Sequence, residues 1–372
     1  MSLRFRCRIF AAGLLIAWPA MAILAIEFAF ESSARAARHR RAIERSRELL
    51  RGVLELYPGT TVAVGHDDEI VWSAGFGYAD VQRKIPVSAA TQFRIGRVSE
   101  TLTAAAAARL QQEGRLDLDA PVSRYVPSFP EKGFVLTSRQ LGGHMAGLRA
   151  PPDDQDPGRR HCTQLEDALN AFVREPLLRA PGTQFLHSSY GYVLLSAVLA
   201  AASGQDFFTC IQEEILRPAR MTATVLEDPR SKSLRLSQFY ERGWLGMLRP
   251  ARPMDTSCQW GAAGFLSTAE DLVRFGMALL RGDIVHKEAL AVLFSPQRTK
   301  SGGNTGQGLG WQISPDSRGR LRYLQSGRTV GGRSAIVLVP EHGLAVTLLA
   351  NIDGEHLDDH ANRIASFFLE PE

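Results

Sequence analysis

Three short stretches of this 372-residue chain hold side chains that could do acid–base or nucleophilic chemistry. They are Arg97-Val98-Ser99-Glu100, His187-Ser188-Ser189 and Gln325-Ser326-Gly327. A histidine such as His187 titrates near neutral pH and could act as the base for a serine hydroxyl, that of Ser189 or Ser326. A nucleophilic serine requires the imidazole within hydrogen-bond reach and a third group that orients the ring. The alternative is that His187 is an ordinary polar residue lining a cleft.

Predicted strands lie near both ends of the chain, and predicted helices lie between them. Runs at residues 60–64 and 70–74 flank a polar turn, and runs at 334–339 and 344–350 flank Pro340-Glu341-His342-Gly343, so each pair predicts a hairpin. Helices are expected at residues 101–112, 165–178, 190–202 and 268–280. Residues 227–260 are rich in Arg, Pro and Ser and are expected to run over the surface. This order predicts a sheet closed by the two termini, with a helical insertion.

Several motifs follow one another along the body of the chain. They are Phe93-Arg94-Ile95-Gly96, residues 114–122 (GRLDLDAPV), His144-Met145-Ala146-Gly147-Leu148, Pro181-Gly182-Thr183-Gln184-Phe185 and residues 261–272 (GAAGFLSTAEDL). In this order they resemble the serine β-lactamase-related family, which includes class C β-lactamases, D-alanyl-D-alanine carboxypeptidases and esterases. The resemblance covers about residues 53–370 and implies an α+β fold of the β-lactamase/penicillin-binding-protein type. That fold is an antiparallel sheet flanked by helices. An all-helical subdomain is inserted, here at about residues 100–255, and the catalytic cleft lies between the two parts.

The first catalytic motif of this chain differs from that of the family. The family's acyl transfer through a serine ester needs a serine and, three residues later, a lysine on the same face of a helix. By resemblance those positions hold Arg97 and Glu100. Arginine stays protonated and is no nucleophile, and a carboxylate reverses the charge that a lysine would bring. Ser99 lies about 200° around the helix axis from the nucleophile position and is expected to point away from the cleft.

The second and third motifs depart as well, while the glycines around them remain. By resemblance, His187-Ser188-Ser189 replaces Tyr-x-Asn, and Gln325-Ser326-Gly327 replaces Lys or His, Ser or Thr, and Gly. Tight backbone is still expected at Gly96, Gly147, Gly182, Gly264 and Gly327. The resemblance implies that the backbone N–H groups of residues 97 and 328 keep an oxyanion hole able to bind anions or carbonyls. Arg97 is expected to fill part of that space, paired with Glu100.

Charge and cysteine content exclude some functions of the folded body. The formal net charge is +4, but residues 1–52 hold 10 of the 43 basic and 4 of the 39 acidic residues, so the remainder carries −2. A body without excess positive charge argues against nucleic-acid binding. Four cysteines (Cys7, Cys162, Cys210 and Cys258) lie far apart without a Cys-x-x-Cys motif, so we expect no zinc. We also expect no cofactor. In an extracytoplasmic body, one disulfide would leave one thiol over.

The amino-terminal segment predicts a membrane anchor. After a short basic stretch at 1–8, residues 9–26 form an uncharged run of 18 residues, just long enough to span a bilayer. We therefore expect a transmembrane signal anchor at 9–30, the alternative being a signal peptide cleaved after Ala20-Met21-Ala22. Residues 31–52 are expected to form an exposed basic stalk helix, or one lying on anionic headgroups. The domain at 53–372 follows.

The orientation of that anchor depends on which charges are weighed. The arginines that follow the apolar run, counted alone, would place the body in the cytoplasm. Glu27 and Glu31 directly at the far boundary favour the opposite orientation. We expect a single-pass protein with the bilayer as a partner and an extracytoplasmic, periplasmic body.

Two functions are compatible with these residues. The favoured interpretation is a membrane-anchored, β-lactamase-like pseudoenzyme with a binding, scaffolding or regulatory role, whose cleft takes an unidentified small molecule or protein. The alternative is a serine hydrolase for an ester or amide, rebuilt around His187. A serine hydroxyl beside His187 would favour the hydrolase, and an Arg97 side chain filling the cleft would favour the pseudoenzyme.

Overall fold

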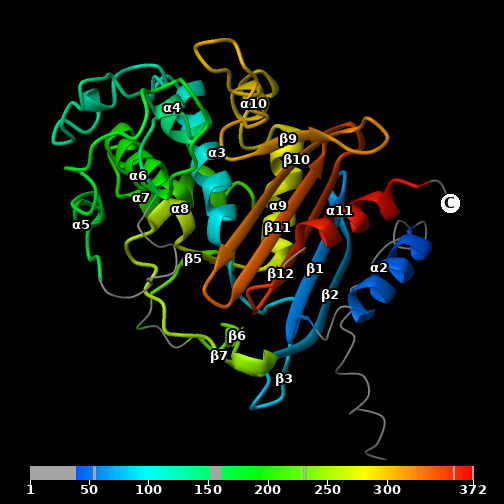
Figure 1. The fold of residues 1–372 in the computed structure, drawn as a ribbon. Coiled ribbons are helices and arrows are strands. Elements are labelled where there is room, and N and C mark those ends of the chain that lie inside the picture. Colours follow the sequence, from blue (N-terminus) through cyan, green and yellow to red (C-terminus); the bar gives the residue numbers. More distant parts are fainter. Residues whose placement is uncertain are drawn as a thin grey trace, which may run out of the picture.

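The computed structural model describes residues 39–52, 56–150, 161–228, 230, 233–354 and 357–370. Its centre is a seven-stranded antiparallel sheet in the order β3-β2-β1-β12-β11-β10-β9. Helices α2 and α11 lie on one face, α9 lies on the other, and the remaining helices gather beside the sheet (Figure 1). The strands are β1 (Gly59–His66), β2 (Glu69–Asp80), β3 (Ile85–Pro86), β9 (Gln312–Pro315), β10 (Leu321–Thr329), β11 (Gly332–Val339) and β12 (Leu344–Ala350).

The middle strands are apolar along nearly their whole length because helices cover both faces of the sheet. Successive side chains of a strand point to opposite faces. Accordingly Ala335 and Val337 of β11 join the core layer under α2 (Arg40–Gly52) and α11 (Leu357–Phe368). Ile336 and Leu338 join the layer under α9 (Ala269–Arg281). Both hairpins expected from the sequence are present, and the sheet is closed by the two ends of the body.

The helical part encloses α3, whose amino-terminal end meets the sheet. Residues 104–108 of α3 are five consecutive buried alanines, and their small side chains let α6 and α8 pack closely against the helix. The helices of this part are α3 (Ser99–Gln112), α4 (Ser138–Gly142), α5 (Leu165–Leu169), α6 (Ser189–Ser203), α7 (Phe207–Ile211), α8 (Trp260–Ala263) and α10 (Lys287–Phe294). A small sheet of β4 (Phe93–Arg94), β8 (Phe265–Ser267) and β5 (Val225–Leu226) leads into α3.

One of two helix predictions is confirmed, and the other predicts too long a helix. The helix at 268–280 is present as α9, where the Thr268 hydroxyl accepts from the Asp271 N–H and Gly282 follows with a φ of +86°. The helix expected at 165–178 stops as α5 at Leu169, and the longer prediction is wrong. Pro176 disfavours helix at the residue before it and cannot sit in a helix interior. Lys132 Nζ instead donates hydrogen bonds to the carbonyl oxygens of Val173 and Glu175.

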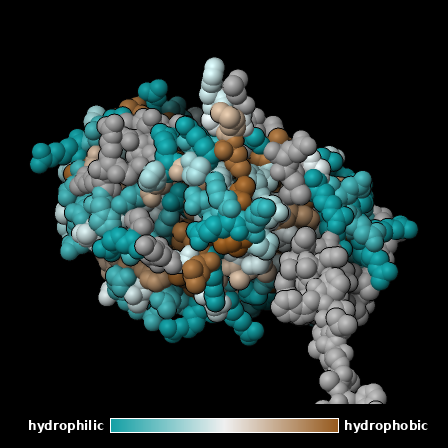
Figure 2. Space-filling view, turned by 90° about the horizontal axis from the view of Figure 1, so that it is seen from below, coloured by the Kyte–Doolittle hydropathy of each residue, from teal (hydrophilic) through white to brown (hydrophobic). Residues whose placement is uncertain are grey.

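The segment at 227–260 is only partly a surface excursion. It forms a hairpin of β6 (Tyr240–Arg242) and β7 (Leu248–Pro250), whose tip exposes Trp244 and Met247. Seen from that end of the molecule, hydrophobic residues gather near the middle of the face, between hydrophilic ones (Figure 2). Tyr240 nevertheless is fully buried, and its hydroxyl accepts from the Val81 N–H and donates to Gln82 Oε1. The prediction of a purely superficial segment is therefore wrong.

The predicted stalk helix packs on the body instead of standing free. Ala42, Ile43 and Leu50 of α2 are buried in the same core layer as α11. Arg45 pairs with Glu370, and its guanidinium lies 4.0 Å from the Phe367 ring centroid. An apolar stripe at helical spacing explains this docking, because the exposed arginines occupy the other side of the helix. Residues 40–52 thus belong to the folded body, which corrects the free stalk expected at 31–52.

The predicted anchor at 9–30 lies outside the described residues. Within the described part of the chain, no single helix is long and apolar enough to cross a membrane. The pair Ser189–Ser203 and Phe207–Leu216, bent by 80°, passes the same test by length and composition alone.

One disulfide joins the helical part to the segment before α8. Cys162 and Cys258 form the bond, and Cys210 is a buried free thiol. The sequence allowed one such bond among the three cysteines of the body, and the fold selects this pair.

Replacing both bonded cysteines, Cys162→Ser with Cys258→Ser, is expected to lower the free energy of unfolding by about 3–5 kcal/mol. The bond spans 96 residues, so its loss frees a long loop in the unfolded chain. Urea denaturation with and without reductant measures the change. Reductant is expected to shift the wild-type midpoint and leave the double variant unaffected. An unchanged wild-type midpoint under reduction would contradict the prediction.

Candidate functional site

Close backbone packing holds the start of α3 against strand β10. The short 3-10 turn Gly96–Val98 runs directly into α3, and Gly96 has a φ of +50°. A Cβ at Gly327 of β10 would lie 2.2 Å from the Ile95 carbonyl oxygen and 2.9 Å from the Arg97 nitrogen. A Cβ at Gly96 would lie 3.1 Å from the Arg328 nitrogen. The two backbone positions expected to supply an oxyanion hole, 97 and 328, therefore lie on touching segments.

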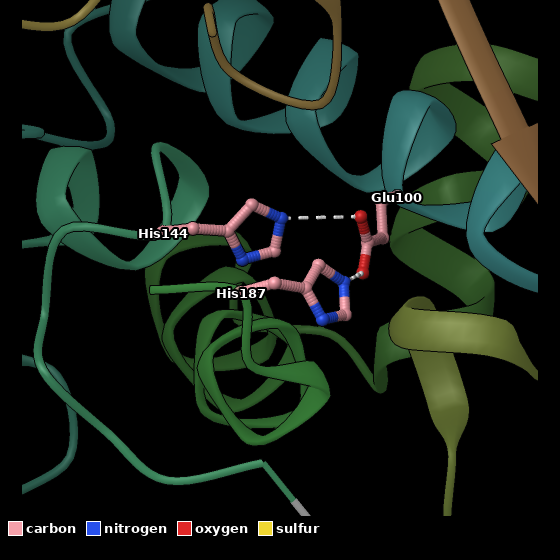
Figure 3. Close-up of side chains that lie close together, drawn as sticks. All are labelled: Glu100, His144 and His187. Atoms are coloured by element: carbon pink, nitrogen blue, oxygen red, sulfur yellow. Dashed lines mark hydrogen bonds and ion pairs between the residues drawn. The ribbon is translucent and has the colours of Figure 1, made fainter. Parts of the chain in front are cut away.

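Glu100 is fully buried, and its carboxylate faces two imidazoles (Figure 3). Oε2 of Glu100 lies 3.3 Å from His144 Nε2, and Oε1 lies 3.5 Å from His187 Nε2. The two ring centroids are 4.5 Å apart. Gln325 Nε2 donates to Glu100 Oε2 at 3.3 Å and to the Gly310 carbonyl at 3.1 Å. The fold thus brings together one residue from each of the three departed motifs, at positions 100, 187 and 325.

The electrostatics of this cluster favour an ionised carboxylate beside a neutral imidazole. Burial alone would raise the pKa of the Glu100 carboxyl, but His144 and His187 outweigh it and hold that pKa at about 2. Burial lowers the pKa of His144, despite the attraction of Glu100. The Ser188 N–H donates to His144 Nδ1 at 3.3 Å, so the neutral ring carries its proton on Nε2. His144 therefore donates that proton to Glu100 Oε2.

His144 is the member of the cluster that sequence reasoning did not single out. It follows α4 with a φ of +53°, and its ring lies edge-on to Phe185 and tilted against Tyr192. It stands in one of the motifs that carried the family resemblance. If every titratable residue of those motifs had been taken as a candidate, His144 would have been among them.

None of the candidate serines is positioned as a nucleophile for His187. Among the described residues, no hydrogen bond joins His187 to Ser189 or Ser326, and His187 Nε2 lies 3.5 Å from Oε1 of Glu100. Ser99 is fully buried, and its hydroxyl accepts from the Phe265 N–H at 3.4 Å, away from Glu100. Ser326 contributes its N–H to the side chain of Gln325.

Arg97 does not pair with Glu100 as expected. In the described part of the chain, no ion pair or hydrogen bond links the two side chains, and Arg97 is partly exposed. The carboxylate of Glu100 points instead into the helical part, where His144 and His187 lie. The nucleophile position is thus occupied by a cationic side chain, and Glu100 contacts His144 and His187 instead.

A second group of serine, histidine and aspartate lies elsewhere, next to the disulfide. His161 Nδ1 lies 2.8 Å from Asp255 Oδ2 and 3.3 Å from Ser257 Oγ. A catalytic triad needs the carboxylate and the hydroxyl on opposite ring nitrogens. Here both contact the same nitrogen, so this group lacks the geometry of a triad. His161 and Ser257 line a cavity of about 310 Å³.

Comparison with known sequences agrees with the order of the motifs. The family model described as Beta-lactamase matches residues 47–368. The serine beta-lactamase-like protein LACTB, mitochondrial, of Mus musculus is 28% identical over 443 residues, covering 88% of this chain and 80% of that protein. The putative penicillin-binding protein PbpX of Bacillus subtilis is 26% identical over 277 residues, covering 74% of this chain and 68% of that protein.

Comparison with solved structures gives the same fold. An octameric penicillin-binding protein homologue from Pyrococcus abyssi superposes with a TM-score of 0.77 at 24% identity, covering 88% of this chain and 77% of the other. A D-stereospecific amidohydrolase from Streptomyces superposes with a TM-score of 0.72 at 21% identity, covering 89% of this chain and 97% of the other. At these identities the likeness concerns the fold alone.

Proposed function

The chain belongs to the β-lactamase family, and we propose that it is a member that has given up serine acyl transfer while keeping the family's fold. A single observation carries this proposal. Where the family places a lysine that takes the proton of the nucleophile, this protein places Glu100, fully buried and held by His144, His187 and Gln325. A carboxylate enclosed by these partners does not supply the amine of that position, and Arg97 supplies no hydroxyl.

The role that remains to such a cleft is binding. The backbone at positions 97 and 328 lies on touching segments at the amino-terminal end of α3, which supports a pair of N–H groups able to bind a carbonyl or an anion. We assign the protein a binding, scaffolding or regulatory role toward a small molecule or a protein segment that enters this cleft. The serine hydrolase alternative is disfavoured because His187 contacts a carboxylate and no serine hydroxyl.

The full chain is expected to form no stable acyl-enzyme with a β-lactam. Purified protein is incubated with a fluorescent penicillin, or with a fluorophosphonate probe for any other nucleophilic serine, and its intact mass is measured. An active penicillin-binding protein treated in parallel provides the positive control. A stoichiometric penicilloyl adduct would overturn the proposal, and a stoichiometric phosphonate adduct would restore the serine hydrolase.

The location that we propose is a membrane, with the body outside the cytoplasm. The uncharged run at residues 9–26 supports the anchor. The Cys162–Cys258 disulfide supports an oxidising compartment, because such bonds rarely persist in a reducing cytosol.

The protein is expected to stay with the membrane fraction after alkaline carbonate extraction and to be released only by detergent. The apolar run continues past Ala22 to Ile26, and Phe28 and Phe30 follow Glu27, which favours retention over cleavage. Amino-terminal sequencing of the mature protein completes the test. A mature chain that begins at Ile23 and is found in the soluble fraction would refute the anchor.

A further inference from the structure

We propose that Glu100, His144 and His187 form a binding site for a divalent transition-metal ion, Zn²⁺ by the nature of its ligands. One carboxylate oxygen and two imidazole nitrogens lie within 4.8 Å of one another, on three segments that are remote in the sequence. Two histidines and a carboxylate form a common ligand set for catalytic zinc, which leaves a fourth position open. The expectation of no zinc weighed only the cysteines, whereas this site uses none.

The spacing of the ligand atoms fits a tetrahedral ion. With metal–ligand bonds of about 2.0–2.2 Å, ligand atoms at the corners of a tetrahedron are separated by roughly 3.4 Å. Glu100 Oε2 lies 3.3 Å from His144 Nε2, and Glu100 Oε1 lies 3.5 Å from His187 Nε2, so the two separations involve different carboxylate oxygens. One carboxylate oxygen and the two ring nitrogens lie within 4.8 Å of one another. Rotation of the carboxylate and of the two rings would bring these three atoms to the separations of a tetrahedral site.

Two buried atoms of the cluster make no hydrogen bond. They are Glu100 Oε1 and His187 Nε2, which face each other at 3.5 Å. The Glu100 side chain is 0% exposed, so bulk water does not reach this oxygen, and its one close partner among the described residues is His187 Nε2 at 3.5 Å. Buried polar atoms are nearly always partnered, and an unpartnered carboxylate oxygen is especially costly. A metal ion would satisfy both atoms at once.

The neighbours of the cluster indicate what the fourth ligand would be. The positive charge of Arg97 is a minor influence on the pKa of His144 beside burial and Glu100, and it mildly favours an anionic ligand, hydroxide or a carboxylate, at the open position. The His187 side chain is 23% exposed, whereas that of His144 is only 6% exposed, so a ligand would approach from the side of His187.

Metal binding also requires a local rearrangement. A neutral imidazole that binds a metal through Nε2 carries its proton on Nδ1. In His144 that nitrogen now accepts the Ser188 N–H at 3.3 Å, so the Ser188 amide, at the start of α6, must turn away. Metal binding would therefore replace the long hydrogen bond from the Ser188 N–H with a coordination bond from His144 Nε2 to the metal.

Full-length protein in detergent, stripped with a chelator, is titrated with Zn²⁺ by calorimetry and with Co²⁺ by visible absorption. We expect one equivalent of metal and the visible bands of four-coordinate Co²⁺. The absence of thiolate-to-cobalt charge transfer excludes Cys7 and Cys210 as ligands. Thermal unfolding with and without Zn²⁺ provides a third measurement, because a ligand that binds only the folded state raises the midpoint.

The variants Glu100→Gln and His187→Gln are each expected to lose at least about 100-fold in affinity, together with the cobalt spectrum. His161→Gln, which alters the other histidine–carboxylate group, is the matched control and keeps both. Unfolding midpoints in chelator identify any variant that fails to fold. If Glu100→Gln does not fold, the His187→Gln variant still tests the site, because the His187 side chain is more exposed. Absence of stoichiometric binding, or binding that survives His187→Gln, would overturn the site. A penicilloyl adduct would overturn only the loss of acyl transfer.

Discussion

Replacing Glu227 with alanine is expected to lower the free energy of unfolding by about 3 kcal/mol or more. Glu227 receives three hydrogen bonds from Arg94 at 2.7–2.9 Å, and the two side chains are only 4% and 9% exposed. Removal of the carboxylate leaves the guanidinium of Arg94 buried, with the Val330 carbonyl and the Phe239 ring as its remaining contacts. Arg94 lies in β4, directly before the turn into α3, so this ion pair supports the candidate site.

The neighbouring residue provides the control for that experiment. Asp228 pairs with Arg230, and these side chains are 47% and 77% exposed. Asp228→Ala is expected to leave the free energy of unfolding almost unchanged, because exposed ion pairs are screened by water. Urea denaturation followed by tryptophan fluorescence compares the two variants with the wild type. Equal losses in both variants would show that the buried ion pair is not what stabilises this part of the fold.

The sheet could be predicted from the sequence because its signals are local. Runs of apolar, β-branched residues interrupted by Pro340 to Gly343 predict a hairpin without reference to the rest of the chain. Helix α9 was equally predictable from its cap and its following glycine. The end of α5 at Leu169 was only partly predictable. Pro176 is a local signal against a helix that reaches residue 178, but Lys132, 41 and 43 residues from the carbonyls it binds, also helps to stabilise the non-helical backbone there.

The docking of α2 shows a different reason for failure. Its many arginines favour a solvated helix, while its stripe of Ala42, Ile43 and Leu50 is short. Whether such a stripe is buried depends on a partner face, and α11 supplies that face from the far end of the chain. Composition alone gives no information on that partner.

The candidate site was predictable in its positions and not in its contacts. By resemblance, the order of the motifs predicts residues 97, 100, 187 and 325 around one cleft, and the structure brings 100, 187 and 325 together. The order does not say which side chain the carboxylate of Glu100 meets, because the choice between Arg97 and the two imidazoles depends on the direction in which the start of α3 faces. That direction is set by the close contact of Gly327 with the backbone at residues 95 and 97.

The double variant Arg97→Ser with Glu100→Lys is expected to acquire weak acylation at most. It returns a hydroxyl and an amine to one face of α3. The new ammonium would stand where Glu100 now accepts from His144 and Gln325, and an ammonium only donates. General acid–base assistance is worth roughly 10²–10⁴ in rate, and His187, Ser189 and Gln325 are unsuited to supply the family's version of it. We expect slow acylation by reactive esters and still slower deacylation.

This expectation is tested by measuring the rates of hydrolysis of a chromogenic β-lactam and a chromogenic ester, together with the intact mass of the adduct. Arg97→Ser alone is the matched control, because it supplies the hydroxyl without the amine and is expected to stay inert. Unfolding midpoints separate a chemical failure from a folding failure, since a lysine at position 100 leaves several buried donors without acceptors. Turnover by the double variant at the rate of an active family member would mean that the second and third motifs still serve hydrolysis. In that case the cleft lost its chemistry at α3 alone, and the residues around His187 would have to be assigned to a working proton path.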